Sequence, residues 1–189
     1  MRNVLVPLAQ GCEELEAVTV IDLLRRAGIQ VVTAGLDDRP VKASRGTVLV
    51  PDLDLDAALE KSYDMIVLPG GQPGSDNLNA DLRIQKLVQI LAAKADTYVA
   101  AICAAPKVLA QAGVLKGKRA TCFPGAINQL SFPDIALTGN SIEHDGNIIT
   151  SKGPGTAMDF ALVLIDILVG KAKRDEVELA LQRPGPTSN

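Results

Sequence analysis

Apolar runs rich in β-forming residues alternate along this chain with longer amphipathic stretches, and this alternation most limits the folds it can adopt. The apolar runs are "NVLVPLA", "QVVTAG", "DMIVLPGG" and "TYVAAIC". The stretches between them, such as residues 13–28 and 80–94, have the length and spacing of amphipathic helices. Strands that alternate with helices form a mostly parallel sheet with helices on both faces. The sequence therefore predicts an α/β sandwich.

Two segments break the alternation and predict β-hairpins. "VKASRGTVLVPD" is expected to turn at Arg45-Gly46, and "SIEHDGNIITS" at Asp145-Gly146, because glycine tolerates the backbone angles of a tight hairpin turn. Residues 154–169 are expected to return to helix.

The chain is predicted to form one domain over residues 1–182, because no repeat, low-complexity block or linker divides its 189 residues. Residues 183–189 have the composition of a frayed end and are predicted to be a flexible C-terminal tail.

Composition argues against several classes of protein. The net charge is −3 with acidic and basic residues mixed, so no basic stripe is available for nucleic acid. No apolar stretch approaches the roughly 20 residues of a membrane span, and no membrane partner is expected. The three cysteines form no CxxC or Cys/His cluster, which predicts no metal site and a reducing compartment. We expect a cytoplasmic protein without a cofactor.

Cys103 lies where an apolar run ends and a helix is expected to begin, in "YVAAICAAPKVLA". A nucleophile at a tight strand-to-helix turn needs small residues two positions before and after it, and Ala101 and Ala105 meet that need. At a helix N-terminus the thiol pKa would fall below about 8.5. The alternative is a buried cysteine that only fills the core.

The "LPGG" segment could supply part of an oxyanion hole. Its glycines follow a strand and allow the backbone to approach a ligand closely. The backbone N–H groups of Gly71 and Ala104 could then stabilise a negative charge next to Cys103. Glycine turns are also common without any function.

Three glutamates crowd the start of the first expected helix. The negative charges of Glu13 and Glu14 are favourable near the positive N-terminal end of the helix dipole. The residues at helical spacing after Glu14 form a largely solvated face. Glu16 steps instead onto Val20 and the apolar residues that follow it, where an ionised carboxylate is costly. A buried carboxyl has a raised pKa and could share a proton with a thiol. Periodicity alone leaves Glu13 open for that role.

The single histidine, His144, directly precedes a predicted turn and is interpreted as a surface residue. A Cys–His pair is therefore not expected, and Glu16 is the remaining candidate for carrying a proton.

Five motifs together carry a family resemblance: "GCEELEAV", "ASRG", "DMIVLPGG", "AAICAAP" and "TSKGPGTAMDF". In this order and at these intervals they resemble the ThiJ/PfpI superfamily from about residue 3 to about residue 170. The closest resemblance is to the branch that contains the Parkinsonism-associated protein deglycase and YajL. The resemblance implies a flavodoxin-like sandwich and a homodimer in which Arg26 and Arg45 border the partner's site.

The same resemblance implies a site. Cys103 would be the reactive cysteine, hydrogen-bonded to Glu16, with N–H donors at Gly71 and Ala104. One departure is Phe123, which stands where the human-type relative has a histidine, so no histidine-assisted step is expected. Ala104 stands where the peptidase branch has a histidine, so a peptidase is not expected. The sequence also lacks the H-x-E pair of glutaminases, so a glutaminase is not expected.

Two functions are consistent with these residues. In the first, the chain is a glyoxalase or deglycase that needs no metal or glutathione, and Cys103 attacks the small aldehyde methylglyoxal or its adducts while Glu16 moves a proton. In the second, Cys103 is a redox sensor that oxidises to a sulfinate, with a chaperone or partner-binding readout. The enzyme is favoured, because a thiol beside a proton carrier and an oxyanion hole is suited to catalysis.

Overall fold

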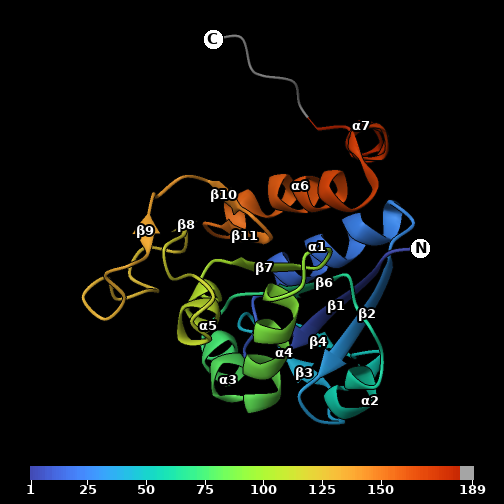
Figure 1. The fold of residues 1–189 in the computed structure, drawn as a ribbon. Helices are drawn as coiled ribbons and strands as arrows, with labels where there is room; N and C mark the ends of the chain where they lie inside the picture. Colours follow the sequence, from blue (N-terminus) through green and yellow to red (C-terminus); the bar gives the residue numbers. More distant parts are fainter. Residues whose placement is uncertain (184–189) are drawn as a thin grey trace.

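The computed structural model describes residues 1–183, and a seven-stranded sheet forms its centre (Figure 1). The strand order is β10-β11-β7-β6-β1-β2-β5. These strands are β1 (Asn3–Leu8), β2 (Gln30–Gly35), β5 (Leu53–Asp54), β6 (Met65–Leu68), β7 (Tyr98–Ile102), β10 (Ile142–Asp145) and β11 (Ile148–Ser151). All neighbours run parallel except β10 and β11. The predicted mostly parallel sheet is confirmed.

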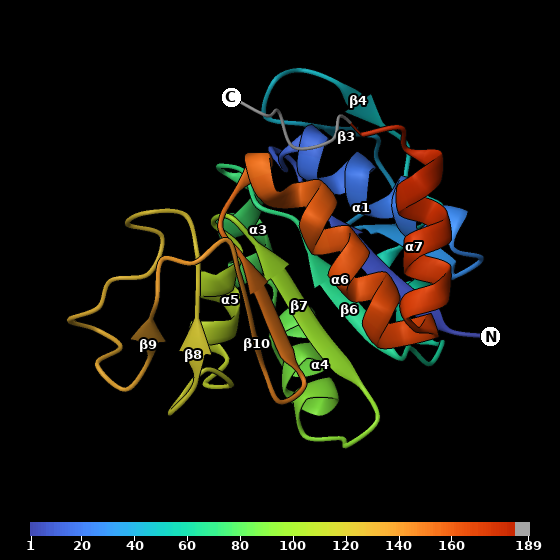
Figure 2. The same cartoon turned by 90° about the horizontal axis from the view of Figure 1, so that it is seen from above.

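Helices cover both faces of this sheet. One face carries α1 (Glu14–Arg26), α6 (Ala157–Val169) and α7 (Lys171–Ala180), which lie together above the strands in Figure 2. The other face carries α2 (Leu55–Leu59), α3 (Gly74–Ala80), α4 (Leu82–Ala92) and α5 (Pro106–Gln111). This is the flavodoxin-like sandwich that the resemblance implied.

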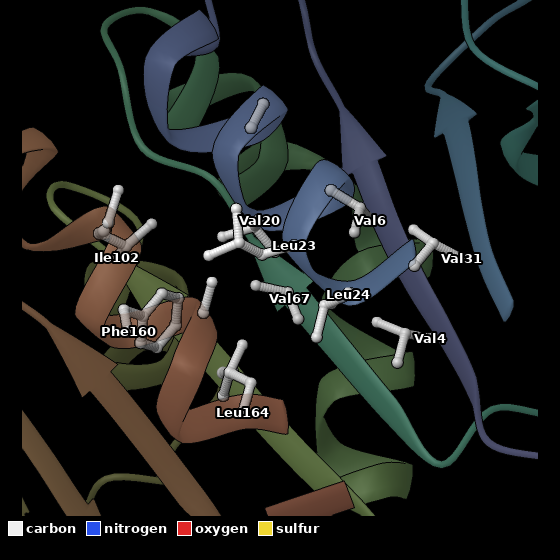
Figure 3. Close-up of a cluster of buried hydrophobic side chains, with 14 of the residues drawn as sticks. Val4, Val6, Val20, Leu23, Leu24, Val31, Val67, Ile102, Phe160 and Leu164 are labelled. Carbon is white, nitrogen blue, oxygen red and sulfur yellow. The ribbon is translucent and has the colours of Figure 1, made fainter. Parts of the chain in front are cut away.

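The inner strands are buried on both sides, which explains their continuous apolar sequences. Val4 and Val6 of β1 pack toward α1 and α6, whereas Leu5 packs into the cluster on the opposite face. Figure 3 shows the first cluster, in which Val20, Leu23 and Leu24 of α1 and Phe160 and Leu164 of α6 close over the sheet. Strands β1, β6 and β7 are neighbours and run parallel, so their carboxyl ends lie at the same edge of the sheet.

Both predicted hairpins are confirmed. Strands β3 (Val41–Lys42) and β4 (Val48–Leu49) pair antiparallel, as do β10 and β11. The helix expected over residues 154–169 begins with a 3-10 turn (Pro154–Thr156) and continues as α6.

Several short elements were not predicted. They include α2, α7 and a separate parallel pair made of β8 (Arg119–Ala120) and β9 (Ala136–Leu137). The expected tail at residues 183–189 lies outside the described residues except for its first member. No helix within residues 1–183 is both long enough and apolar enough to cross a membrane.

Candidate active site

Cys103 occupies a strained corner directly after β7. Its φ is 63°, in the left-handed region that costs a non-glycine residue about 1–3 kcal/mol. The corner is held on both sides, because its N–H donates to the carbonyl of Ser151 at 2.9 Å and its carbonyl accepts from the N–H of Phe123 at 2.7 Å. Helix α5 begins only at Pro106. The corner is therefore present as predicted, and the expected helix follows it with Pro106 in its first turn.

The small neighbours required by this corner are both buried completely. Ala101 and Ala105 each have 0 % exposure, while Cys103 retains 8 %. Cys103 is thus buried, but a small part of it remains exposed to solvent.

Glu16 points into the protein from the first turn of α1. It is fully buried, as expected from its place on the apolar stripe of the helix. Its Oε2 accepts a hydrogen bond from the N–H of Gly70 at 2.8 Å. Its Oε1 accepts none from any residue that the structure describes.

Gly70, the first glycine of "LPGG", lets the glutamate and the cysteine approach one another. A Cβ on Gly70 would lie 2.7 Å from the Cβ of Cys103 and 2.8 Å from Oε2 of Glu16. Real Cβ atoms essentially never come so close to such neighbours. Any side chain at this position would therefore displace one of the two.

The thiol and the carboxyl each change the pKa of the other. Burial raises the pKa of the Glu16 carboxyl to about 7. Burial, followed by the charge of Glu16, raises the pKa of the Cys103 thiol to about 12. The expectation of a lowered thiol pKa therefore does not hold while Glu16 is ionised, because burial and the carboxylate outweigh the backbone donors. The site holds a thiolate when the shared proton lies on Glu16.

Backbone donors also act on the sulfur. Hydrogen bonds from the N–H groups of Gly71 and Ala104 lower the pKa of Cys103, opposing the effects of burial and Glu16. The φ of Gly71 is 90°, and a Cβ there would lie 2.4 Å from the backbone nitrogen of Glu13. Only glycine fits at this position, and its N–H faces the cysteine as the sequence suggested.

The other two glutamates have separate structural tasks. Glu13 caps α1 by accepting from the N–H of Glu16 at 2.9 Å, so the choice that the sequence left open falls on Glu16. Glu14 is partly exposed, on the solvated face of α1 that the sequence indicated. It accepts from the N–H of Arg45 at 3.0 Å, from the N–H of Thr47 at 3.3 Å and from Ser44 Oγ at 3.2 Å. These hydrogen bonds hold the β3–β4 turn against α1.

A cavity of about 470 Å³ opens over Cys103. Its lining residues are Glu13, Ser44, Arg45, Gly71, Gln72, Cys103, Ala104, Phe123, Pro124, Gly125, Ala126 and Pro154. Arg45 thus reaches the site of its own chain, whereas the resemblance placed it beside a partner's site. Arg26 does not line the cavity and pairs with Asp22 at 2.6 Å on the outer surface of α1.

The remaining candidates lie elsewhere. His144 is exposed on β10, and its Nε2 lies 2.9 Å from the carbonyl of Gly146, as expected of a surface residue. Cys12 and Cys122 are buried with free thiols and do not line the cavity. Within residues 1–183, no group of three His, Cys, Asp or Glu side chains is placed to hold a metal ion.

Nearly the whole chain is similar to known proteins. Residues 2–167 match the DJ-1/PfpI family. Protein DJ-1alpha of Drosophila melanogaster is 42% identical over 95% of this chain and 83% of its own length. Glutathione-independent glyoxalase DJR-1.2 of Caenorhabditis elegans is 34% identical over 89% of each chain. The crystal structure of Drosophila melanogaster DJ-1beta is 38% identical, covers 97% of this chain and 99% of its own, and has a TM-score of 0.91. The chain therefore belongs to the DJ-1/PfpI family.

Proposed function

We propose that this protein is a glutathione-independent glyoxalase that converts methylglyoxal, or a related α-oxoaldehyde, to the corresponding hydroxy acid. The observation that carries the proposal is the buried Glu16 carboxyl, which faces the Cys103 thiol with a pKa of about 7. General acid–base catalysis is most efficient when the pKa of the group lies near the working pH. The similarity to the nematode protein named as a glyoxalase supports the same activity.

The first step would form a bond between sulfur and carbon. With the shared proton on Glu16, the Cys103 thiolate adds to the aldehyde carbon of methylglyoxal. The aldehyde oxygen gains negative charge, which the N–H groups of Gly71 and Ala104 stabilise. That oxygen then takes the proton from Glu16, giving a neutral hemithioacetal and an ionised carboxylate.

The second step would move a proton between adjacent carbons. Glu16 removes the proton from the former aldehyde carbon, giving an enediolate, and returns it to the neighbouring carbon. The hydroxyl proton of the hemithioacetal passes to the former ketone oxygen, which leaves a thioester of lactate on Cys103. Water then cleaves the thioester, releases lactate and restores the thiol. Methylglyoxal and one water molecule are consumed for each lactate formed, and no redox partner is used.

The test is lactate formation from methylglyoxal by protein kept free of metal and glutathione. Cys103→Ser should abolish turnover, and Glu16→Gln should lower kcat by about 10²-fold or more. Cys122→Ser is the matched control, because this cysteine is also buried but does not line the cavity. Full turnover in Glu16→Gln would refute the mechanism.

Deglycase activity is a finer form of the same proposal. Adducts of methylglyoxal with amines or thiols are in equilibrium with the free aldehyde, so an enzyme that consumes the aldehyde also depletes them. A true deglycase must release the amine faster than the adduct dissociates spontaneously. Amine release measured beside lactate formation, in the same reaction, distinguishes the two.

A redox sensor is the second candidate, and the unpartnered Oε1 of Glu16 favours it. Peroxide would oxidise the Cys103 thiolate first to a sulfenate and then, with a second equivalent, to a sulfinate. The carboxyl of Glu16 and the two backbone N–H groups could hold the sulfinate oxygens by charge-assisted hydrogen bonds. Negligible methylglyoxal turnover, together with a stable sulfinate whose yield falls in Glu16→Gln, would favour the sensor.

We also propose that the protein forms a homodimer. Leu15 and Val18 are about half exposed on α1, and Val48 and Val50 are exposed on the neighbouring β4 segment that Glu14 ties to this helix. A second copy could cover these four apolar side chains. Sedimentation should give a dimer at micromolar concentration, and a monomer would contradict the proposal.

A further inference from the structure

The side chains that line the cavity over Cys103 are of two kinds, called here the polar wall and the apolar wall. The polar wall contains Glu13, Ser44, Arg45 and Gln72. The apolar wall contains Phe123, Pro124, Ala126 and Pro154. The aldehyde chemistry described above uses only the floor of this cavity, where the sulfur and the two N–H donors lie. The apolar wall has no part in it.

Phe123 is the main side chain of the apolar wall, and its backbone is fixed relative to the nucleophile. Its N–H donates to the carbonyl of Cys103 at 2.7 Å, and its carbonyl accepts from the N–H of Ala126 at 2.9 Å. The ring lies beside Gly153, with Cδ2 3.6 Å from the point where a Cβ on that glycine would stand. The aromatic ring therefore packs beside Gly153 and lines the same cavity as Cys103.

The ring is nevertheless only half covered. Phe123 is 50 % exposed, while Phe160 of the core is 0 % exposed. Removing the remaining apolar surface from water would be favourable, and an aromatic partner would add about 0.5–1.5 kcal/mol. A ligand in the cavity is in a position to do this.

The size of the cavity also exceeds what methylglyoxal needs. Its volume of about 470 Å³ lies within the range of about 300–1,000 Å³ that is typical of sites for drug-sized ligands. The few heavy atoms of methylglyoxal would fill only the part next to the sulfur. The space beside Phe123 would stay empty of substrate.

We propose that Phe123, together with Pro124 and Pro154, forms a subsite for an apolar or aromatic group attached to the carbonyl carbon next to the aldehyde. The preferred substrates are then aryl and branched alkyl α-oxoaldehydes rather than methylglyoxal. This inference rests on the proposed function and narrows its substrate class. Phe123 acts as a specificity-determining residue, and Cys103 and Glu16 keep their roles.

The first experiment compares kcat/KM for phenylglyoxal and methylglyoxal from initial rates. Phe123→Ala should lower the ratio of the two values by about 2- to 10-fold, the factor that corresponds to the loss of one aromatic contact. Phe123→Leu keeps an apolar side chain without the ring and should give an intermediate ratio. Leu130→Ala is the control, because Leu130 is 92 % exposed and does not line the cavity. Its ratio should equal that of the wild type.

The second experiment does not depend on turnover. Cys103 is alkylated with N-benzyl iodoacetamide and with N-methyl iodoacetamide, and mass spectrometry gives the two rate constants. The benzyl-to-methyl ratio should fall about 2- to 10-fold in Phe123→Ala and remain unchanged in Leu130→Ala.

The two readouts separate the two ideas. If the wild type converts neither aldehyde, the proposed glyoxalase function fails, and the alkylation ratio still decides the subsite. If Phe123→Ala leaves the alkylation ratio unchanged, the subsite is refuted even when both aldehydes are turned over. Circular dichroism of each variant confirms that it is folded before rates are compared.

Discussion

Replacing Glu16 by glutamine should make the folded protein more stable above pH 7. The carboxyl is fully buried and its pKa is raised to about 7 from an ordinary value of 4.5. A group whose pKa is raised on folding stabilises the folded state below its unfolded pKa. That stability is lost as the pH rises through the folded pKa. The folded state therefore loses the stability that Glu16 contributes as the pH rises from 4.5 to 7.

The size of the effect follows from the two pKa values. Each pH unit of difference corresponds to about 1.36 kcal/mol, so the raised pKa of Glu16 represents about 3 kcal/mol. A glutamine can still accept the N–H of Gly70 and never ionises. At pH 8, Glu16→Gln should therefore gain up to about 3 kcal/mol in unfolding free energy, or about 6–12 °C in Tm for a chain of this length. Near pH 4.5 the difference should vanish.

The assay is urea unfolding followed by circular dichroism at pH 5, 6, 7 and 8, with reductant present to keep Cys103 as a thiol. The wild type should lose stability relative to Glu16→Gln across this series. Parallel profiles for the two proteins would refute the reasoning, because they would mean that Glu16 has the same pKa in the folded and unfolded chains. The same variant should lose turnover, so stability and catalysis are expected to change in opposite directions.

Three further outcomes follow from contacts described above. Gly70→Ala should lower the alkylation rate of Cys103 by about 10²-fold and the unfolding free energy by about 1–3 kcal/mol, because the added methyl group would displace the cysteine or the glutamate. Thiol alkylation and thermal melting test this prediction. Gly155→Ala is the control, because a Cβ at Gly155 would meet nothing within 4 Å. Glu14→Gln should destabilise the protein at pH 7 and converge with the wild type as the pH falls from 4.5 to 2. Hydrogen bonds from backbone N–H groups lower the pKa of Glu14 to about 2 despite the opposing effect of burial; equal stability at pH 7 would contradict this. Phe160→Ala should cost about 3–5 kcal/mol in urea unfolding, since the ring is fully buried; a loss below about 1 kcal/mol would show that the core closes around the missing ring.

The long elements could be predicted because their burial is uniform. Strands β1, β6 and β7 are covered on both faces, so each appears in the sequence as an unbroken apolar run bounded by polar or glycine residues. Strands β5, β8 and β9 have two residues each, too few for any period to be visible.

The site was only partly predictable for a related reason. The burial of Glu16 could be predicted from helical periodicity, since it depends on the helix that carries this residue. The choice between Glu16 and Glu13 could not, because the cap that Glu13 forms is seen only in the structure. The contact of Glu14 with the turn at Arg45 and Thr47 joins two segments that are distant in sequence, and no local pattern indicates it. The thiol pKa was expected in the wrong direction because it depends first on the burial of Cys103 and then on the approach of Glu16, and the fold sets both.

The position of Gly70 between Glu16 and Cys103 determines which part of the fold must open before heating disrupts the site. The carboxyl and the sulfur meet across Gly70, which is separated from β6 only by Pro69 and lies next to the end of β7. Because Glu16 lies on α1, separating the two groups requires α1 to leave the sheet, an opening that exposes the core cluster beneath this helix. In native-state hydrogen exchange, the amides of Gly70 and Cys103 should accordingly exchange only through global unfolding.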